Sequence, residues 1–234
     1  DYTRAITIEP KYAFIYYNRG NAYKDLEQYE NAIADFDRAI AIDSQYAGAY
    51  YNRGTAFAKL EQYENAISDF THAITIEPQD ASAYYNRGTA YYYIKQYEEA
   101  IADFTQAITI DPQYAQAYNN RGNTYTDLEQ YEEAIVDFTQ AITIDPQYAQ
   151  AYYSRGIVYG TLGQYEEAIS DYSQVITINP QYANVYKNRA AVYTVTNQIE
   201  AAESDLVIFF DLGGTLSEDV RISFEQRGVT VPGS

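Results

Sequence analysis

The chain has 234 residues, with 15 lysines and arginines against 33 aspartates and glutamates, and a formal net charge of -18. Such a charge repels phosphate backbones and anionic lipid, so we expect no nucleic-acid partner and no membrane-surface partner. The chain has no cysteine, which excludes disulfides, thiol nucleophiles and thiolate metal sites.

Targeting signals are not visible in this sequence. No stretch approaches the roughly 18 apolar residues that a membrane span needs, and the N-terminus lacks the charged-then-apolar pattern of a secretion signal. The compartment is left open, with the cytoplasm favoured. The absence of methionine predicts a fragment or a processed form, because a translated chain begins with that residue.

A block of five residues, Tyr84-Tyr85-Asn86-Arg87-Gly88, returns with small changes every 34 residues. A fixed period of this size is typical of a repeat array. The six repeats span 13–46, 47–80, 81–114, 115–148, 149–182 and 183–216, and the second half of a truncated repeat precedes them at 1–12. Positions are numbered within each repeat below, so that Ala13 is position 1.

Two amphipathic helices are predicted in each repeat, because small and apolar residues recur at steps of three and four. In the third repeat the polar link Lys95-Gln96 separates the two helices, and Pro112 ends the second one because proline cannot continue a helix. Gly88 at position 8 and Ala100 at position 20 are expected to let the paired helices approach closely.

The C-terminal end departs from this pattern. The sixth repeat has Ala190 in place of glycine, Glu203 in place of an apolar residue, and no proline. Terminal repeats are atypical because one of their faces meets solvent. Beyond the sixth repeat, residues 217–228 predict a C-terminal capping helix that stops at Gly228, and residues 229–234 a loose tail.

The repeat resembles the tetratricopeptide repeat (TPR), whose pattern has an aromatic residue at position 4, Gly at 8, Tyr at 11, Ala at 20, Phe at 24, Ala at 27 and Pro at 32. The fourth repeat fills all seven positions with Tyr118, Gly122, Tyr125, Ala134, Phe138, Ala141 and Pro146. The resemblance covers residues 1 to about 212. It implies an all-α fold, a right-handed α-solenoid of helix-turn-helix units whose first helices line a concave groove that binds peptides or protein segments.

Position 7, usually leucine in this family, is arginine in every repeat, and position 23 is aspartate. A helical wheel of about 100° per residue places position 7 on the core side, where an unpaired charge would be costly. We therefore expect structural ion pairs, within a repeat or between neighbouring repeats, with ligand-binding arginines as the alternative. The residues are Arg19, Arg53, Arg87, Arg121, Arg155 and Arg189, with Asp35, Asp69, Asp103, Asp137, Asp171 and Asp205.

The face of the first helix opposite the core carries asparagine at position 6 and tyrosine at position 5 in most repeats. A carboxamide offers donors and an acceptor that suit an extended backbone, and tyrosine stacks on side chains at low entropic cost. The predicted peptide-binding residues are Tyr17, Asn18, Asn21, Tyr51, Asn52, Tyr85, Asn86, Asn120, Asn123, Tyr153 and Asn188. The alternative is that these asparagines only bond neighbouring helices.

Signs of catalysis are weak. His72 is the only histidine, and no cluster of nucleophiles or metal ligands surrounds it in the repeat register. Residues 207–216 resemble the first motif of haloacid dehalogenase-like hydrolases, an apolar strand that ends in a nucleophilic aspartate, here Asp211. Only 19 residues follow Thr215, so the rest of such a domain does not fit. We predict no enzyme, no cofactor and no metal site.

The leading hypothesis is a scaffold that binds an extended segment of a neutral to basic partner protein in the Tyr/Asn groove. The alternative is a structural protein whose solenoids stack head to tail into a filament or oligomer, since the sequence opens on half a repeat and such a contact does not close.

Overall fold

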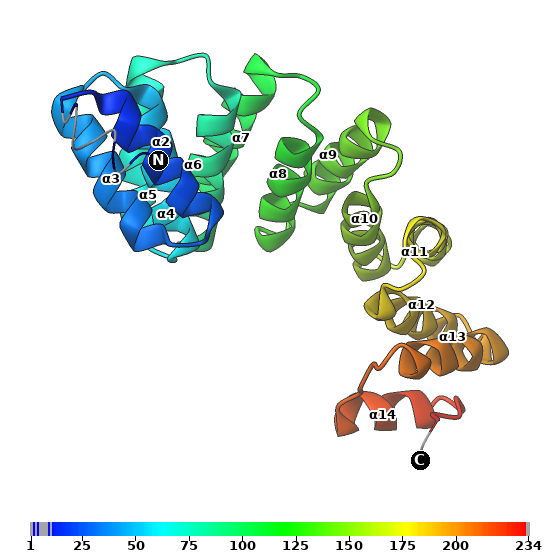
Figure 1. The fold of residues 1–234 in the computed structure, drawn as a ribbon. Helices are drawn as coiled ribbons and strands as arrows, with labels where there is room; N and C mark the ends of the chain where they lie inside the picture. The colour runs from blue at the N-terminus through cyan, green and yellow to red at the C-terminus, as the bar shows by residue number, and fades with distance from the viewer. Residues whose placement is uncertain (1, 3, 5–8, 10, 233–234) are drawn as a thin grey trace. The chain divides into compact units, whose positions relative to one another are not determined.

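The computed structural model describes residues 2, 4, 9 and 11–232. This described part contains 13 α-helices and no strand, which confirms the all-α fold class. Successive helices pack on one another from α2 to α7 and again from α9 to α13 (Figure 1). The truncated repeat predicted at 1–12 lies largely outside the described residues. None of the described helices has the length and apolarity that a membrane crossing requires.

Each repeat forms a first and a second helix, as predicted from its period. The first helices are α2 (Ala13–Asp25), α4 (Ala47–Lys59), α6 (Ala81–Tyr93), α8 (Ala115–Asp127), α10 (Ala149–Thr161) and α12 (Ala183–Val195). The second helices are α3 (Tyr29–Ile42), α5 (Tyr63–Ile76), α7 (Tyr97–Ile110), α9 (Tyr131–Ile144), α11 (Tyr165–Ile178) and α13 (Ile199–Asp211). Helix α14 (Glu218–Glu225) follows the last repeat. The chain divides into two compact parts, 1–124 and 125–234, which are described separately.

The turn between the two helices of a repeat is built at position 15, where the backbone is left-handed. In the third repeat this residue is Lys95, with a φ of 60°. The amide of Lys95 donates to the Tyr92 carbonyl and that of Gln96 to the Tyr91 carbonyl, both at 2.9 Å. This pair of bonds closes the end of α6 as a Schellman motif. The fifth repeat has Gly163 at the same position, with a φ of 74°.

Within a repeat, the two helices meet where glycine at position 8 lies against the aromatic ring at position 24. A Cβ added to Gly88 would lie 3.0 Å from the Phe104 ring, closer than ordinary van der Waals contact. The sixth repeat carries Ala190 and Leu206 at these two positions, and both are buried. The larger residue at position 8 is therefore accompanied by a smaller side chain at position 24, so Ala190 fits the core.

The hydrolase-like stretch is helical in the structure. Val207 to Asp211 form the last residues of α13, so no strand delivers Asp211 to an active site. Gly213 has a φ of 81°, and the Gly214 amide donates to the Phe209 carbonyl at 2.9 Å. A Cβ at Gly214 would collide with the Phe209 ring. The two glycines therefore make the turn that ends α13.

The C-terminal segment is packed rather than loose, so the expectation of a loose tail is wrong for residues 229–232. Val229 and Val231 are buried in the same apolar cluster as Leu206. Between these two valines, the Thr230 amide donates to Glu203 Oε1 at 2.8 Å. This bond lowers the pKa of the Glu203 carboxyl. The glutamate that departs from the repeat pattern thus holds the segment that covers α13.

Candidate functional site

In five repeats, the first to the third, the fifth and the sixth, the structure shows the arginine at position 7 paired with the aspartate at position 23 of its own repeat. Arg87 on α6 donates from Nε and Nη2 to the two carboxylate oxygens of Asp103 on α7, at 2.7 and 2.8 Å. This hydrogen-bonded pair raises the pKa of Arg87, so the guanidinium stays charged. The same two-bond arrangement joins Arg19 to Asp35, Arg53 to Asp69, Arg155 to Asp171 and Arg189 to Asp205.

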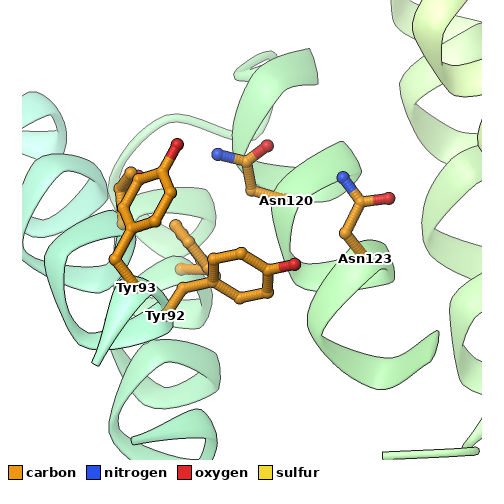
Figure 2. Close-up of a pocket in the computed structure, with 6 residues that line it drawn as sticks. Tyr92, Tyr93, Asn120 and Asn123 are labelled. Atoms are coloured by element: carbon orange, nitrogen blue, oxygen red, sulfur yellow. The ribbon is translucent and has the colours of Figure 1, made fainter. Parts of the chain in front are cut away.

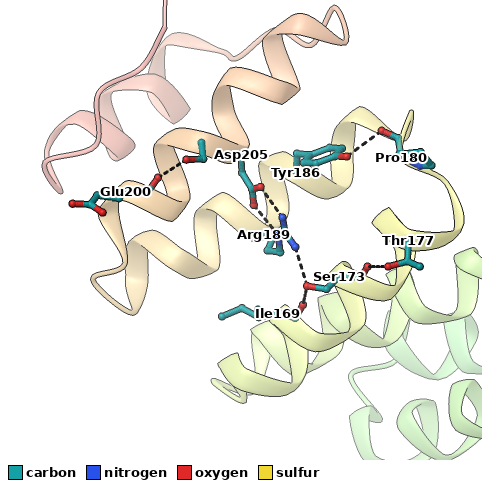
Figure 3. A network of polar contacts seen from close by, with 9 residues as sticks. Ile169, Ser173, Thr177, Pro180, Tyr186, Arg189, Glu200 and Asp205 are labelled. Carbon is teal, nitrogen blue, oxygen red and sulfur yellow. Dashed lines mark hydrogen bonds and ion pairs between the residues drawn. The ribbon is translucent and has the colours of Figure 1, made fainter.

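The third guanidinium nitrogen reaches the preceding repeat. Arg189 Nη1 donates to Ser173 Oγ on α11 at 2.8 Å while its other nitrogens hold Asp205 on α13 (Figure 3). Position 25 of the preceding repeat supplies the acceptor each time: Asp37 for Arg53, Thr71 for Arg87, Thr105 for Arg121 and Thr139 for Arg155. Three helices and two repeats are therefore linked by each of four arginines, Arg53, Arg87, Arg155 and Arg189.

Arg121 and Asp137 belong to the two different parts of the chain. Arg121 donates to Thr105 within the N-terminal part at 2.8 Å, and Asp137 is buried in the C-terminal part.

Tyrosine at position 5 and asparagine at position 6 form hydrogen-bonded rungs between neighbouring repeats. Asn86 Nδ2 donates to the hydroxyl of Tyr51 at 2.8 Å. The corresponding bonds run from Asn52 to Tyr17, from Asn120 to Tyr85 and from Asn188 to Tyr153, each at 3.0 Å. The amide nitrogen of these asparagines therefore bonds a neighbouring repeat. This is the alternative stated in the sequence analysis, in which the asparagines bond neighbouring helices.

The rung tyrosines are wedged between repeats. The Tyr85 ring lies 5.9 Å from that of Phe104 and 4.9 Å from that of Tyr114, centroid to centroid. Burial, and next the proximity of Tyr182, raises the pKa of Tyr153 to about 12. In the fourth repeat Asn119 replaces the tyrosine, and in the fifth Ser154 replaces the asparagine, so the sequence lacks both residues of one rung.

Open pockets lie beside the rungs in the N-terminal part. One, of about 410 Å³, is lined by residues of α4, α5 and α6, including Lys59, Asn86, Thr89 and Tyr93. A second, of about 150 Å³, is lined by Thr89, Tyr92, Tyr93, Phe104, Asn120 and Asn123. Figure 2 shows the two tyrosines on one side of this pocket and the two asparagines on the other.

An equivalent pocket lies in the C-terminal part, between α10 and α12. It has a volume of about 340 Å³, and Ile157, Gly160, Asn188 and Val195 are among its lining residues. Ile157, Gly160 and Asn188 occupy repeat positions 9, 12 and 6. These positions supply Thr89, Tyr92 and Asn120 to the smaller N-terminal pocket. Val195 occupies position 13 beside Asn188, as Tyr93 does beside Asn86 in the larger pocket. The pockets thus recur with the repeat, and the first helices carry most of their lining.

The predicted site residues divide between these two features. Asn86, Asn120, Asn123 and Asn188 line pockets, whereas the tyrosines at position 5 pack in the rungs and line none of those described. Asn52 is buried, and its Oδ1 accepts from Lys24 Nζ at 2.7 Å. Asn18 and Asn21 on α2 are half-buried.

Tyr92 and Tyr93 line the smaller pocket, although they were not among the predicted peptide-binding residues. The signal was present in the sequence, because positions 12 and 13 lie on the same stripe of the first helix as position 9.

Groups that could hold a metal were sought as well. Among the described residues, no cluster of three or more His, Asp or Glu side chains is arranged to bind an ion. His72 stacks on Tyr50 with ring centroids 5.0 Å apart, and its Nδ1 contacts the Ser68 carbonyl at 2.9 Å. Its contacts are thus with the aromatic ring and backbone around it.

Comparison with known proteins supports the repeat assignment. A TPR repeat model matches residues 20–61 and 122–163, and two tetratricopeptide repeat models match 47–80, 81–114 and 149–182, and 1–34 and 104–136. Comparison with curated proteins gives no match.

Solved structures with the same fold include three that cover most of this chain. The crystal structure of YrrB, described as a TPR protein with an unusual peptide-binding site, is 26% identical, has a TM-score of 0.66, and is matched over 79% of this chain and 95% of YrrB. PilF of Pseudomonas aeruginosa is 18% identical with a TM-score of 0.77, over 92% and 96% of the two chains. MamA is 23% identical with a TM-score of 0.66, over 70% and 96%. Together, the family models, the solved structures and the helix pairs show that the chain belongs to the tetratricopeptide repeat family.

Proposed function

We propose that this protein is a non-enzymatic scaffold that binds an extended segment of another protein along its first helices. The observation that carries the proposal is the recurrence of open pockets at the same repeat positions. An extended segment also repeats at regular steps, so successive side chains can enter successive pockets. The similarity to YrrB, a TPR protein with a peptide-binding site, supports the same conclusion.

The pocket of Tyr92, Tyr93, Asn120 and Asn123 offers the contacts that such a segment needs. Tyr93 is 58% exposed, and its ring meets that of Tyr92 at 74° with the centroids 5.8 Å apart. Two tyrosine rings set at this angle form a corner that can hold a side chain at low entropic cost.

Backbone recognition requires free hydrogen-bonding groups beside these rings. The Nδ2 of Asn86 is bonded to Tyr51, while its Oδ1 has no partner among the described residues. That oxygen is available to accept a backbone N–H from a bound segment. This rung therefore orients the Asn86 carboxamide and leaves its oxygen to the ligand, whereas Asn52 Oδ1 already accepts from Lys24.

The charge of the protein indicates the sign of the partner. With a net charge of -18, the chain attracts basic segments, is indifferent to neutral ones and repels acidic ones.

Head-to-tail assembly is the alternative, and the C-terminal end weighs against it. Helix α14 follows the last repeat, and Val229 and Val231 pack into the apolar cluster that includes α13 residues. Part of the face that a following molecule would use is therefore covered by the chain itself.

A peptide-library selection followed by binding measurements tests the proposal. We expect Tyr93→Ala together with Asn123→Ala to weaken the selected peptides by about tenfold or more. Tyr12→Ala is the matched control, because Tyr12 is also 58% exposed and lines none of the described pockets. Failure to select any peptide, or unchanged affinity in the double variant, would refute the proposal.

Light scattering after size exclusion addresses the alternative. We expect a single mass that does not grow with concentration. Open-ended growth would favour assembly over segment binding.

A further inference from the structure

The pockets of the C-terminal part are more apolar than those of the N-terminal part. At position 9 the first four repeats carry Asn21, Thr55, Thr89 and Asn123, whereas the last two carry Ile157 and Ala191. Position 13 of the last repeat is Val195. Gly160 at position 12 adds no side chain, and a Cβ built there would have only Val192 at 4.0 Å nearby. The pocket between α10 and α12 therefore suits an aliphatic side chain.

A second apolar pocket adjoins it between α12 and α14. This pocket has a volume of about 290 Å³, and its walls include Ala191, Val195, Val220 and Phe224. Ala191 and Val195 line both pockets, so the two form one continuous apolar surface. Helix α14 forms the far wall of this pocket, through residues such as Val220 and Phe224. The side chains remain open to a ligand, since Ile157, Val195 and Val220 are all exposed.

From these two pockets, and resting on the proposed binding of an extended segment, we infer that the C-terminal part binds a basic polyproline II segment with apolar side chains at positions i and i+3. The two pockets flank α12, so the width of one packed helix, about 8–10 Å, sets the distance between them. A polyproline II helix has three residues per turn and rises about 9.3 Å per turn, so residues i and i+3 lie on one side at this spacing.

A β-strand fits the two pockets less well. Its same-side residues are i and i+2, which are only about 6.6 Å apart, and residue i+3 points to the opposite face. The spacing of apolar residues in a ligand therefore distinguishes the two backbone conformations.

The charge of this part of the chain determines which ligand residues are favoured beside the apolar residues i and i+3. Residues 125–234 include 16 acidic and 5 basic side chains. Asp219 and Arg227 are the charged residues that line the α12–α14 pocket, and they offset each other. The surrounding excess of acid favours lysine or arginine on either side of the apolar pair.

Fluorescence polarisation with defined peptides and the full chain tests the inference. The probe is a labelled proline-rich peptide with leucines at i and i+3 and lysines at both ends. The comparison peptides move the second leucine to i+2 or replace both leucines by alanine. We expect the i, i+3 peptide to bind about tenfold more tightly than either, because only it fills both pockets.

Val195→Ser is the decisive variant, because Val195 lines both pockets and its 45% exposure makes loss of folding unexpected. We expect it to weaken the i, i+3 peptide by about tenfold, with Ile157→Ser as an independent second variant. Val136→Ser is the matched control, because Val136 is 67% exposed on α9 and lines none of the described pockets. Thermal melting of each variant checks that the fold is kept.

Several results would overturn the inference, and they differ from failure of the proposed function. Equal binding of the i+2 and i+3 peptides would exclude the polyproline II geometry, and unchanged binding by Val195→Ser would exclude the site. If only library-selected peptides bind and Tyr93→Ala weakens them, segment binding stands and this inference falls. If no library peptide binds, both fall. A concentration-dependent dimer that Val195→Ser disrupts would assign the surface to a second copy instead.

Discussion

Arg87 and Asp103 are joined by two hydrogen bonds of 2.7 and 2.8 Å that connect the two helices of the third repeat. Asp103 is buried, and Arg87 also donates to Thr71 in the second repeat at 3.0 Å. The guanidinium thus has a bonding partner on each neighbouring second helix. Removing the carboxylate leaves a largely buried positive charge without its counter-charge, which is far more costly than losing a surface ion pair.

We expect Asp103→Ala to lower the free energy of unfolding by about 3–5 kcal/mol, measured by urea denaturation. Glu99→Ala is the control, since Glu99 is an exposed acid on the same helix; it should change stability by less than about 0.5 kcal/mol. An unchanged melting temperature in Asp103→Ala would contradict a structural role for the pair.

The fit of Gly88 against Phe104 predicts a compensating pair of substitutions. Gly88→Ala alone should destabilise the protein by about 1–3 kcal/mol, because the added Cβ would lie 3.0 Å from the ring. Adding Phe104→Leu recreates the combination found at Ala190 and Leu206. We expect the double variant to lose less unfolding free energy than the two single variants lose in sum. A double-mutant cycle in thermal unfolding measures this difference. Simple additivity would show that the two positions do not interact.

The left-handed turn at Lys95 predicts a stabilising change. For a non-glycine residue this conformation costs about 1–2 kcal/mol of conformational free energy. Glycine adopts it without that cost but loses more backbone entropy on folding. Lys95→Gly should therefore raise the free energy of unfolding by about 0.5–1 kcal/mol. The same change at exposed Lys59, which lies within α4, should lower stability instead. A loss of stability in Lys95→Gly would contradict the left-handed backbone at this position.

Buried rung tyrosines predict instability in alkali. The pKa of Tyr153 is raised to about 12 in the folded chain, against about 10 for an unfolded tyrosine. Above pH 10 the unfolded state releases a proton that the native state keeps, so stability falls as pH rises from 10 towards 12. Below pH 10 this contribution is fully present and constant.

Tyr153→Phe tests this linkage. The substitution leaves Asn188 Nδ2 without its acceptor, so we expect a loss of about 1 kcal/mol at pH 7. It should also make the decline in melting temperature between pH 10 and 12 shallower. Tyr12→Phe is the control, because Tyr12 is exposed. A wild-type slope in Tyr153→Phe would show that this hydroxyl does not carry the effect.

The repeat register explains why much of the fold could be predicted from the sequence. A charge at position 7 on the core side requires a partner, and the invariant aspartate at position 23 was the residue available to Arg87. Whether the pair lies within or between repeats depends on how the helices cross, which periodicity does not define. In the structure both carboxylate oxygens of Asp103 accept from Arg87 of the same repeat. The third guanidinium nitrogen of Arg87 donates to Thr71 of the preceding repeat.

The groove was harder to predict because its residue types are ambiguous. The carboxamide of Asn86 can bond a ligand or a neighbouring helix, and only the 2.8 Å distance to Tyr51 shows that its nitrogen is engaged. Tyr92 and Tyr93 lie on the groove-facing stripe but outside the Tyr-Asn block, and residue type alone does not tell whether such tyrosines line a pocket. The packed tail was missed because Val229 and Val231 alternate over a stretch too short to show a period.

The three-way bonding of the position 7 arginines has a consequence for how the array comes apart. In each part of the chain, a repeat that unfolds takes the hydrogen-bond acceptor at position 25 away from the arginine of the next repeat. That arginine keeps its own aspartate but loses its bond across the junction, so the junction weakens together with the repeat. The polar bonds thus add a nearest-neighbour coupling to the apolar interface, and they favour melting in blocks over fraying from the ends.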